Sequence, residues 1–312
     1  MTSSDPSIGA PASSGTGAAR ILERGYRSYD GPRLGARGAM RSLVRHSVQR
    51  VLGLKRTFWN KILPFGAIFI AYVPAIAFVG IAALLKERFA RNGVDINQVI
   101  PSYAEFYLFV WAAILVFAAL AAPEVLCTDR RSGMLGLYLA SPLNRDTYLV
   151  AKATAVAFVL SLVTLGPPLF MLIARTIAGV GPDGFGAFIG VLWRVVVGGV
   201  IVAALPGALS LAIASTTTRR AAASAAFILV TIGSAVVSET LVNSGASASL
   251  FVINLPYLPL ELVGRLYGEP AGFVSSSSIN TSTTTMVVAY LVITLGCAAF
   301  VRFRYQSIRV TR

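Results

Sequence analysis

The charged residues that could do chemistry gather in one stretch, residues 123–152, which reads PEVLCTDRRSGMLGLYLASPLNRDTYLVAK. Glu124, Asp129, Arg130 and Arg131 lie close together there, just before a short apolar piece. Charges of both signs beside an apolar patch are typical of a surface that contacts a protein partner. This chemistry is recognition and not bond breaking, so the stretch is a candidate binding surface.

No set of catalytic groups accompanies this stretch. His46 is the only histidine, and Cys127 and Cys297 have no spacing that indicates a disulfide or a metal site. The pattern G-x-x-x-x-G-K-[ST], whose backbone cradles phosphates, does not occur. We therefore expect the chain not to be an enzyme by itself and to bind no cofactor or metal of its own.

Ionisable residues deep in a membrane often mark a transport pathway, because burying their charge is costly. The chain offers Arg194, beside Trp193, as the main candidate, and Glu239 or Glu105 as a partner for it. These residues are candidates for a pathway or an outer ion pair, although Arg194 can also extend to the membrane surface. With no clear relay of such groups, we expect energy to enter from outside the bilayer.

Composition places the chain in a membrane. Of its 312 residues, 55% are hydrophobic and 13% are charged, and the mean hydropathy is +0.72. The formal net charge is +14, and most of the basic residues flank the apolar runs on one side. This bias favours cytoplasmic N- and C-termini, with membrane lipids and not nucleic acid as the partner of the basic residues.

The fold class follows from the length of the apolar runs, since about 20 helical residues cross a bilayer. We predict an all-α polytopic membrane protein with a six-helix transmembrane domain over residues 62–303. A Pro167-Pro168 pair should kink the third span. The six expected spans are 62–85, 104–122, 148–174, 188–214, 221–241 and 286–301.

Four segments outside the spans complete the predicted organisation. Residues 1–35 have the composition of a disordered tail, and 36–61 have the periodicity of an amphipathic interfacial helix. Residues 242–285, between the fifth and sixth spans, are too apolar for a free loop and predict outer re-entrant helices. Residues 304–312 form a cytoplasmic tail.

The loop at 123–146 has signals for its own structure. Pro123 followed by Glu124 suits the first turn of a helix, Gly133 permits a break, and Ser141-Pro142 ends the apolar piece. Asn144 or Asp146 can cap the next span. Two interpretations fit equally well: a knob that enters a cleft on a cytosolic partner, and a loop that lies on the lipid headgroups.

The loop resembles a known family. Glu124, Arg130, Gly133, Ser141-Pro142, Arg145 and Lys152 are similar to the first inner loop of the type-2 permeases of ATP-binding-cassette (ABC) exporters. The order of helices resembles that family too. The resemblance implies a coupling helix between spans two and three, seated in an ABC ATPase subunit that binds ATP and Mg. It assigns Glu124, Asp129, Arg130, Arg131, Gly133 and Pro142 to that interface.

The same resemblance implies a homodimer or a heterodimer with a related permease. The excess of Arg over Lys, with many Ala and Gly residues, favours a bacterial source and so a bacterial inner membrane. Two other functions stay open at this point: a lipid-modifying membrane enzyme that uses the basic helix as a platform, and a non-transporting assembly subunit. The first lacks a catalytic cluster.

Overall fold

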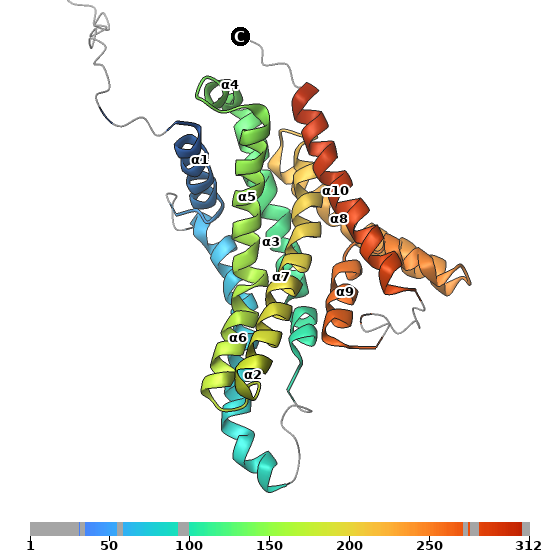
Figure 1. Ribbon diagram of the computed structural model, residues 1–312. Helices are drawn as coiled ribbons and strands as arrows, with labels where there is room; N and C mark the ends of the chain where they lie inside the picture. The colour runs from blue at the N-terminus through green and yellow to red at the C-terminus, as the bar shows by residue number, and fades with distance from the viewer. Residues whose placement is uncertain are drawn as a thin grey trace, which may run out of the picture. The chain divides into compact units, whose positions relative to one another are not determined.

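The computed structural model describes residues 31, 35–54, 59–92, 100–270, 274 and 281–307. Apart from Gly31, these residues belong to one compact unit, Leu34–Arg312. The predicted disordered tail, most of the tail at 304–312 and much of the linker after residue 270 lie outside the described residues. All regular elements in the described part are helices (Figure 1).

The helices follow the predicted order along the chain. Within the described residues, six helices, with α5 and α6 taken as one, are long and apolar enough to cross a membrane, as predicted for a multi-pass helical membrane protein. Their bounds are α1 Gly35–Val51, α2 Trp59–Arg91, α3 Tyr103–Arg131, α4 Met134–Leu139, α5 Arg145–Thr164, α6 Gly166–Ile177, α7 Gly184–Ala214, α8 Arg220–Asn243, η2 Ala248–Ile253, α9 Tyr257–Tyr267 and α10 Thr283–Ser307.

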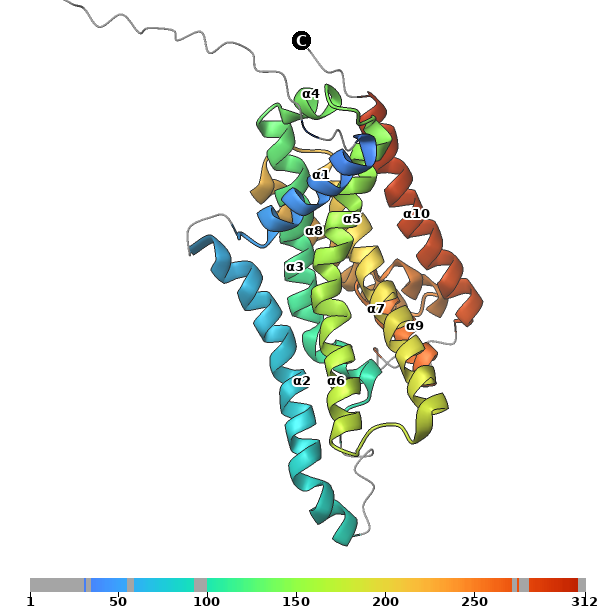
Figure 2. The ribbon, with the colours of Figure 1, turned by 60° about the vertical axis from the view of Figure 1, so that its left-hand side comes forward.

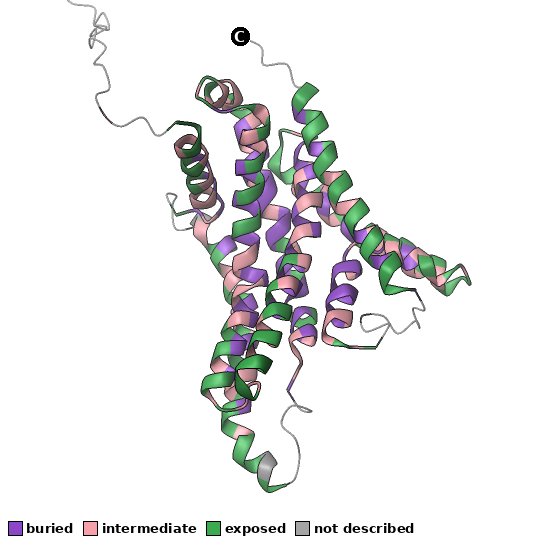
Figure 3. Ribbon diagram, in the orientation of Figure 1, coloured by how far each residue is buried: buried purple, intermediate pink, exposed green. Residues whose placement is uncertain are grey.

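Helix α3 forms the centre of the packing. It contacts α1, α2, α5, α7, α8 and α9, and its side chains are mostly buried (Figure 3). Exposed apolar side chains instead cover much of α2, α8 and α10. This is the pattern expected when the outer helices face lipid or another membrane protein.

The third span is broken where the proline pair predicted a kink. Helix α5 ends at Thr164 and α6 begins at Gly166. Pro168 has no N–H to donate to the carbonyl of Thr164, four residues earlier. The hydroxyl of Tyr107 on α3 donates to that carbonyl at 2.9 Å, so the break leaves no orphaned acceptor there.

Pro123 does not begin a helix, and this corrects the prediction for the loop. Helix α3 continues through Pro123 to Arg131, because a neighbouring helix supplies the missing hydrogen bond. Pro123 has no N–H to donate to the carbonyl of Ala119, and this carbonyl instead accepts a hydrogen bond from Ser224 Oγ on α8 at 2.6 Å. The second span is consequently longer at this end than the sequence indicated.

Helix α1 is amphipathic as predicted, but its apolar face packs on the protein. Leu43, Ser47 and Val51 are buried against the bundle, and Figure 2 shows α1 lying across α3 and α5. Gly53 follows with a φ of 66°, a left-handed conformation that glycine adopts at low cost. It ends α1 and turns the chain toward α2.

Two short helices, η2 and α9, occupy the stretch between α8 and α10. Helix α9 packs against α7, α3 and α10, and most of its residues are buried. Its buried Glu261 pairs with Arg265 one turn later, with Oε1 and Nε 3.2 Å apart. Short helices were expected here, and their re-entrant placement in a membrane stays a prediction.

Candidate functional site

The loop that joins α3 to α5 lies beside the last turn of α10, at one end of the helices (Figures 1 and 2). We call this end the α4 end. Gly133 has a φ of 66°, which lets the chain leave α3 and enter α4 at once. Asn144 precedes α5, and its backbone N–H donates to Thr147 Oγ1 at 2.8 Å. The loop is therefore a compact helical turn with defined ends.

Part of this loop is open to contact. Arg131, Gly133 and Pro142 are exposed, and Leu137 of α4 is 64% exposed. The other side of α4 is fixed, because Leu135 and Tyr138 pack against the core. An exposed leucine beside an arginine, on a helix anchored from below, is a surface suited to a protein partner.

Asp129 lies on the inside of the same turn. Its side chain is fully buried and forms ion pairs with Arg50 of α1 and Lys152 of α5. Lys152 Nζ lies 2.6 Å from Asp129 Oδ2, and the Tyr148 hydroxyl donates to that oxygen at 3.0 Å. Lys152 also donates to Ser47 Oγ at 3.0 Å. In this structure Asp129 presents no surface to a partner, and it joins three helices.

We call Arg50, Asp129, Tyr148, Lys152 and Ser47 the Asp129 network. Two aromatic rings lie against the ammonium group of Lys152, since the ring centres of Tyr138 and Tyr148 are each 5.4 Å from Lys152 Nζ. Such placement stabilises an ammonium group electrostatically. Lys152, with 1% of its side chain exposed, is thus satisfied by a carboxylate, a hydroxyl and two aromatic faces.

Two groups of this region outside the membrane-spanning helices have shifted pKa values. Burial disfavours the charge on Arg50, but its hydrogen bond to Asp129 and the charge of that carboxylate outweigh the burial, so its pKa is raised. Burial raises the pKa of Tyr138. Arg50 thus stays a cation and Tyr138 a neutral phenol at neutral pH.

Glu124 and Arg130 tie α3 to other helices. Glu124 forms an ion pair with Arg220 at the start of α8. Arg130 donates to the carbonyl of Ser215, just after α7, and to that of Thr217 at 3.4 Å. A cation at the carboxyl end of a helix also complements the helix dipole. Both side chains hold the turn between α7 and α8 against α3.

The start of α5 is tied to the end of α10. Arg145 donates to the carbonyls of Gln306 and, at 3.3 Å, Tyr305. Asp146 forms a two-pronged ion pair with Arg302, with both N–O distances at 3.1 Å. The loop therefore has polar links to α1, α8, α10 and the α7–α8 turn.

The structure divides the predicted interface residues into two groups. Arg131, Gly133 and Pro142 are exposed, whereas Glu124, Asp129 and Arg130 contact other parts of the same chain.

The candidate outer pair is not formed, because no ion pair joins Arg194 and Glu239. Arg194 is exposed on α7, and Glu239 is partly buried on α8.

Sequence reasoning missed the partners of Asp129. Lys152 and Arg50 approach Asp129 from two other helices, and the spacing of residues along the chain does not predict such contacts. One signal was present: Ser47 lies between Leu43 and Val51 on the apolar face of α1. A polar residue at four-residue spacing within an apolar stripe indicates a buried polar contact.

Within the described residues, no three His, Cys, Asp or Glu side chains gather in a way that could hold a metal ion. The exposed side of α4 is suited to binding a partner, and the polar links of α3 and α5 are suited to transmitting movement between helices. Comparison with protein-family models gives no match, and a search of curated proteins also finds none.

Proposed function

We propose that this chain is the membrane subunit of an ATP-driven transporter of the ABC type, and that it acts as an exporter. A separate ATPase subunit would bind ATP and Mg and dock on the loop between α3 and α5. The observation that carries the proposal is the set of links around this loop. One short exposed turn connects the ends of α3 and α5, and polar side chains on these two helix ends link them to α1, α8, α10 and the α7–α8 turn.

These links make the loop a suitable point for applying force. A push on α4 moves the end of α3 and the start of α5 directly. The Asp129 network extends the movement to α1, the pair of Glu124 with Arg220 extends it to α8, and the pair of Asp146 with Arg302 extends it to α10. Packed helices with discrete contacts transmit such displacements as rigid elements.

The proposal assigns different tasks to the two groups of loop residues. Arg131, Leu137 and Pro142, which are exposed, would contact the ATPase. Glu124, Asp129 and Arg130 would pass movement on within the chain. Gly133 would supply the sharp turn that presents α4.

Three further features belong to the proposal. The α4 end would face the cytoplasm of a bacterial cell, with both termini on that side. Two permease chains, identical or related, would assemble with two ATPase subunits. The exposed apolar faces of α2, α8 and α10 would contact a second permease chain or lipid.

Gentle detergent purification from the native membrane tests the proposal. We expect an ATPase subunit with a phosphate-binding loop to co-purify with the chain. Leu137→Asp should remove it, because the change places a charge at the centre of the proposed contact. Ser307→Asp, an exposed position at the end of α10, is the matched control and should retain it. Absence of such a subunit, or full retention with Leu137→Asp, would contradict the proposal.

A further inference from the structure

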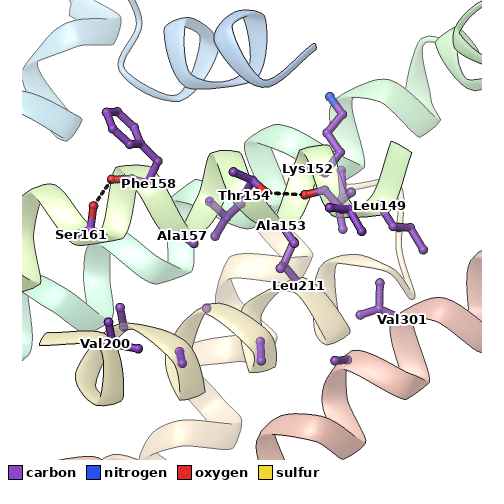
Figure 4. Close-up of a pocket in the computed structure, with 18 of the residues that line it drawn as sticks. Leu149, Lys152, Ala153, Thr154, Ala157, Phe158, Ser161, Val200, Leu211 and Val301 are labelled. Atoms are coloured by element: carbon purple, nitrogen blue, oxygen red, sulfur yellow. Dashed lines mark hydrogen bonds between the residues drawn. The ribbon is translucent and has the colours of Figure 1, made fainter. Parts of the chain in front are cut away.

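Helix α5 carries the Asp129 network on one side and borders a groove on the other. The groove has a volume of about 830 Å³ and lies between α5, α7 and α10 (Figure 4). Ala153, Ala157 and Phe158 line it from α5, Val200 and Ala204 from α7, and Ala298 from α10. A volume of this size is within the range of ligand sites in proteins.

The length of the groove is chemically apolar. Thr154 and Ser161 line it, but each hydroxyl donates to a carbonyl of its own helix, at 2.8 Å and 2.7 Å. Both hydroxyl protons are therefore already used in hydrogen bonds within α5. Lys152 contributes only its alkyl stem, because its nitrogen points away from the groove, as Figure 4 shows.

One end of the groove is polar, and it lies at the α4 end. There Asp146 and Arg302 line the groove as an exposed ion pair, with 52% and 64% of their side chains exposed. Asp146 uses two of the five N–H donors of Arg302, so three remain for another acceptor.

The order of polar and apolar surface identifies the kind of occupant. All three walls belong to helices long and apolar enough to span a membrane, so in a bilayer the open side of the groove would face hydrocarbon. Its polar end, at the start of α5 and near the end of α10, would then lie at the membrane surface. A phospholipid has the same order, with a phosphate at the surface and an acyl chain below. Arginine is well suited to bind phosphate.

We propose that this groove binds one phospholipid, with its phosphate at Arg302 and an acyl chain along Ala157 and Ala204. Binding of this lipid does not depend on the ATPase. Lys152 would then connect the two sides of α5, since its stem touches the groove and its ammonium pairs with Asp129.

Photo-crosslinking tests the site without ATP or partner. The full chain is placed in phosphatidylcholine nanodiscs with phosphatidylglycerol that carries a diazirine on its acyl chain, and the labelled peptides are mapped by mass spectrometry. We expect labels to concentrate on the groove walls over residues 149–165, 199–211 and 298–302. Ala157→Trp should reduce these labels about tenfold, because the indole fills the groove. Val236→Trp, on the exposed face of α8, should leave them unchanged.

Two further arms separate the parts of the proposal. Arg302→Ala should reduce labelling by the phosphatidylglycerol probe and leave labelling by a diacylglycerol probe, which lacks phosphate, unchanged. Ala204→Leu adds a smaller side chain to the groove and replaces Ala157→Trp in the experiment if the tryptophan variant does not fold. Labels spread over α2 and α8 in proportion to exposure would overturn the site. Equal loss of both probes with Arg302→Ala would overturn the phosphate contact. Either result leaves the ATPase co-purification, and so the proposed function, untouched.

Discussion

The Asp129 network predicts a large and specific loss of stability when its carboxylate is neutralised. Asp129→Asn keeps the shape of the side chain but leaves Lys152 and Arg50 facing each other without an anion. Their side chains are 1% and 15% exposed, so water can compensate little. Removing one partner of a buried ion pair costs about 3–5 kcal/mol. We expect a loss in that range, concentrated where α1, α3 and α5 meet.

Cys127 provides the assay, because it is buried in α3 two residues before Asp129. With Cys297 replaced by alanine, Cys127 is the only thiol of the chain. Its labelling rate by a membrane-permeant thiol reagent then measures how often this region opens. Since 1.4 kcal/mol corresponds to tenfold, Asp129→Asn should raise the rate between about a hundredfold and a few thousandfold.

Matched variants test whether loss of the Asp129 network causes the faster labelling of Cys127. Asp146→Asn makes the same change in the exposed pair with Arg302 and should raise the rate less than about tenfold, since exposed pairs contribute about 0–1 kcal/mol. Lys152→Met should cost less than Asp129→Asn, because Asp129 keeps Arg50 and Tyr148. In the double variant the two losses should be smaller than additive. A rate for Asp129→Asn that matches Asp146→Asn would refute the reasoning.

Three further predictions concern single contacts. Gly133→Ala should destabilise the chain by about 1–2 kcal/mol in thermal unfolding, because alanine must adopt a left-handed φ; no change would contradict the assigned turn. Tyr107→Phe should cost about 1–3 kcal/mol by orphaning the carbonyl that Pro168 leaves free. In a Pro168→Ala background, which restores an N–H donor, this cost should shrink, and an equal cost in both backgrounds would count against that role. In the reconstituted complex, Glu124→Lys should preserve ATP hydrolysis but reduce transport. The double variant Glu124→Lys, Arg220→Glu, which exchanges the two charges, should restore transport. Unchanged transport in the single variant would argue against a coupling role for Glu124.

The helical spans could be predicted from the sequence because hydrophobic length alone specifies them. The kink at the proline pair was also predictable, since a missing N–H is a local property. The turn at Gly53 and the cap at Asn144 follow from the residue types themselves. These features depend on residues close together in the chain.

The polar interior could not be predicted in the same way. Helix α3 passes through Pro123 because Ser224, about 100 residues later, satisfies the freed carbonyl. Lys152 is buried because Ser47 and Asp129 approach it from two other helices. Such contacts depend on packing between segments that are distant in the sequence. The periodicity and the charge counts of a sequence carry no information about this packing.

The direct test of the central claim is a cross-link from the exposed centre of the loop. Leu137→Cys, in a background without Cys127 and Cys297, is treated with a short bifunctional thiol–amine reagent in native membranes. We predict one main protein adduct, and its mass-spectrometric sequence should contain a phosphate-binding loop of the ABC type. ATP should change the yield of this adduct. An adduct only with lipid, or with a protein that has no nucleotide-binding sequence, would contradict the account.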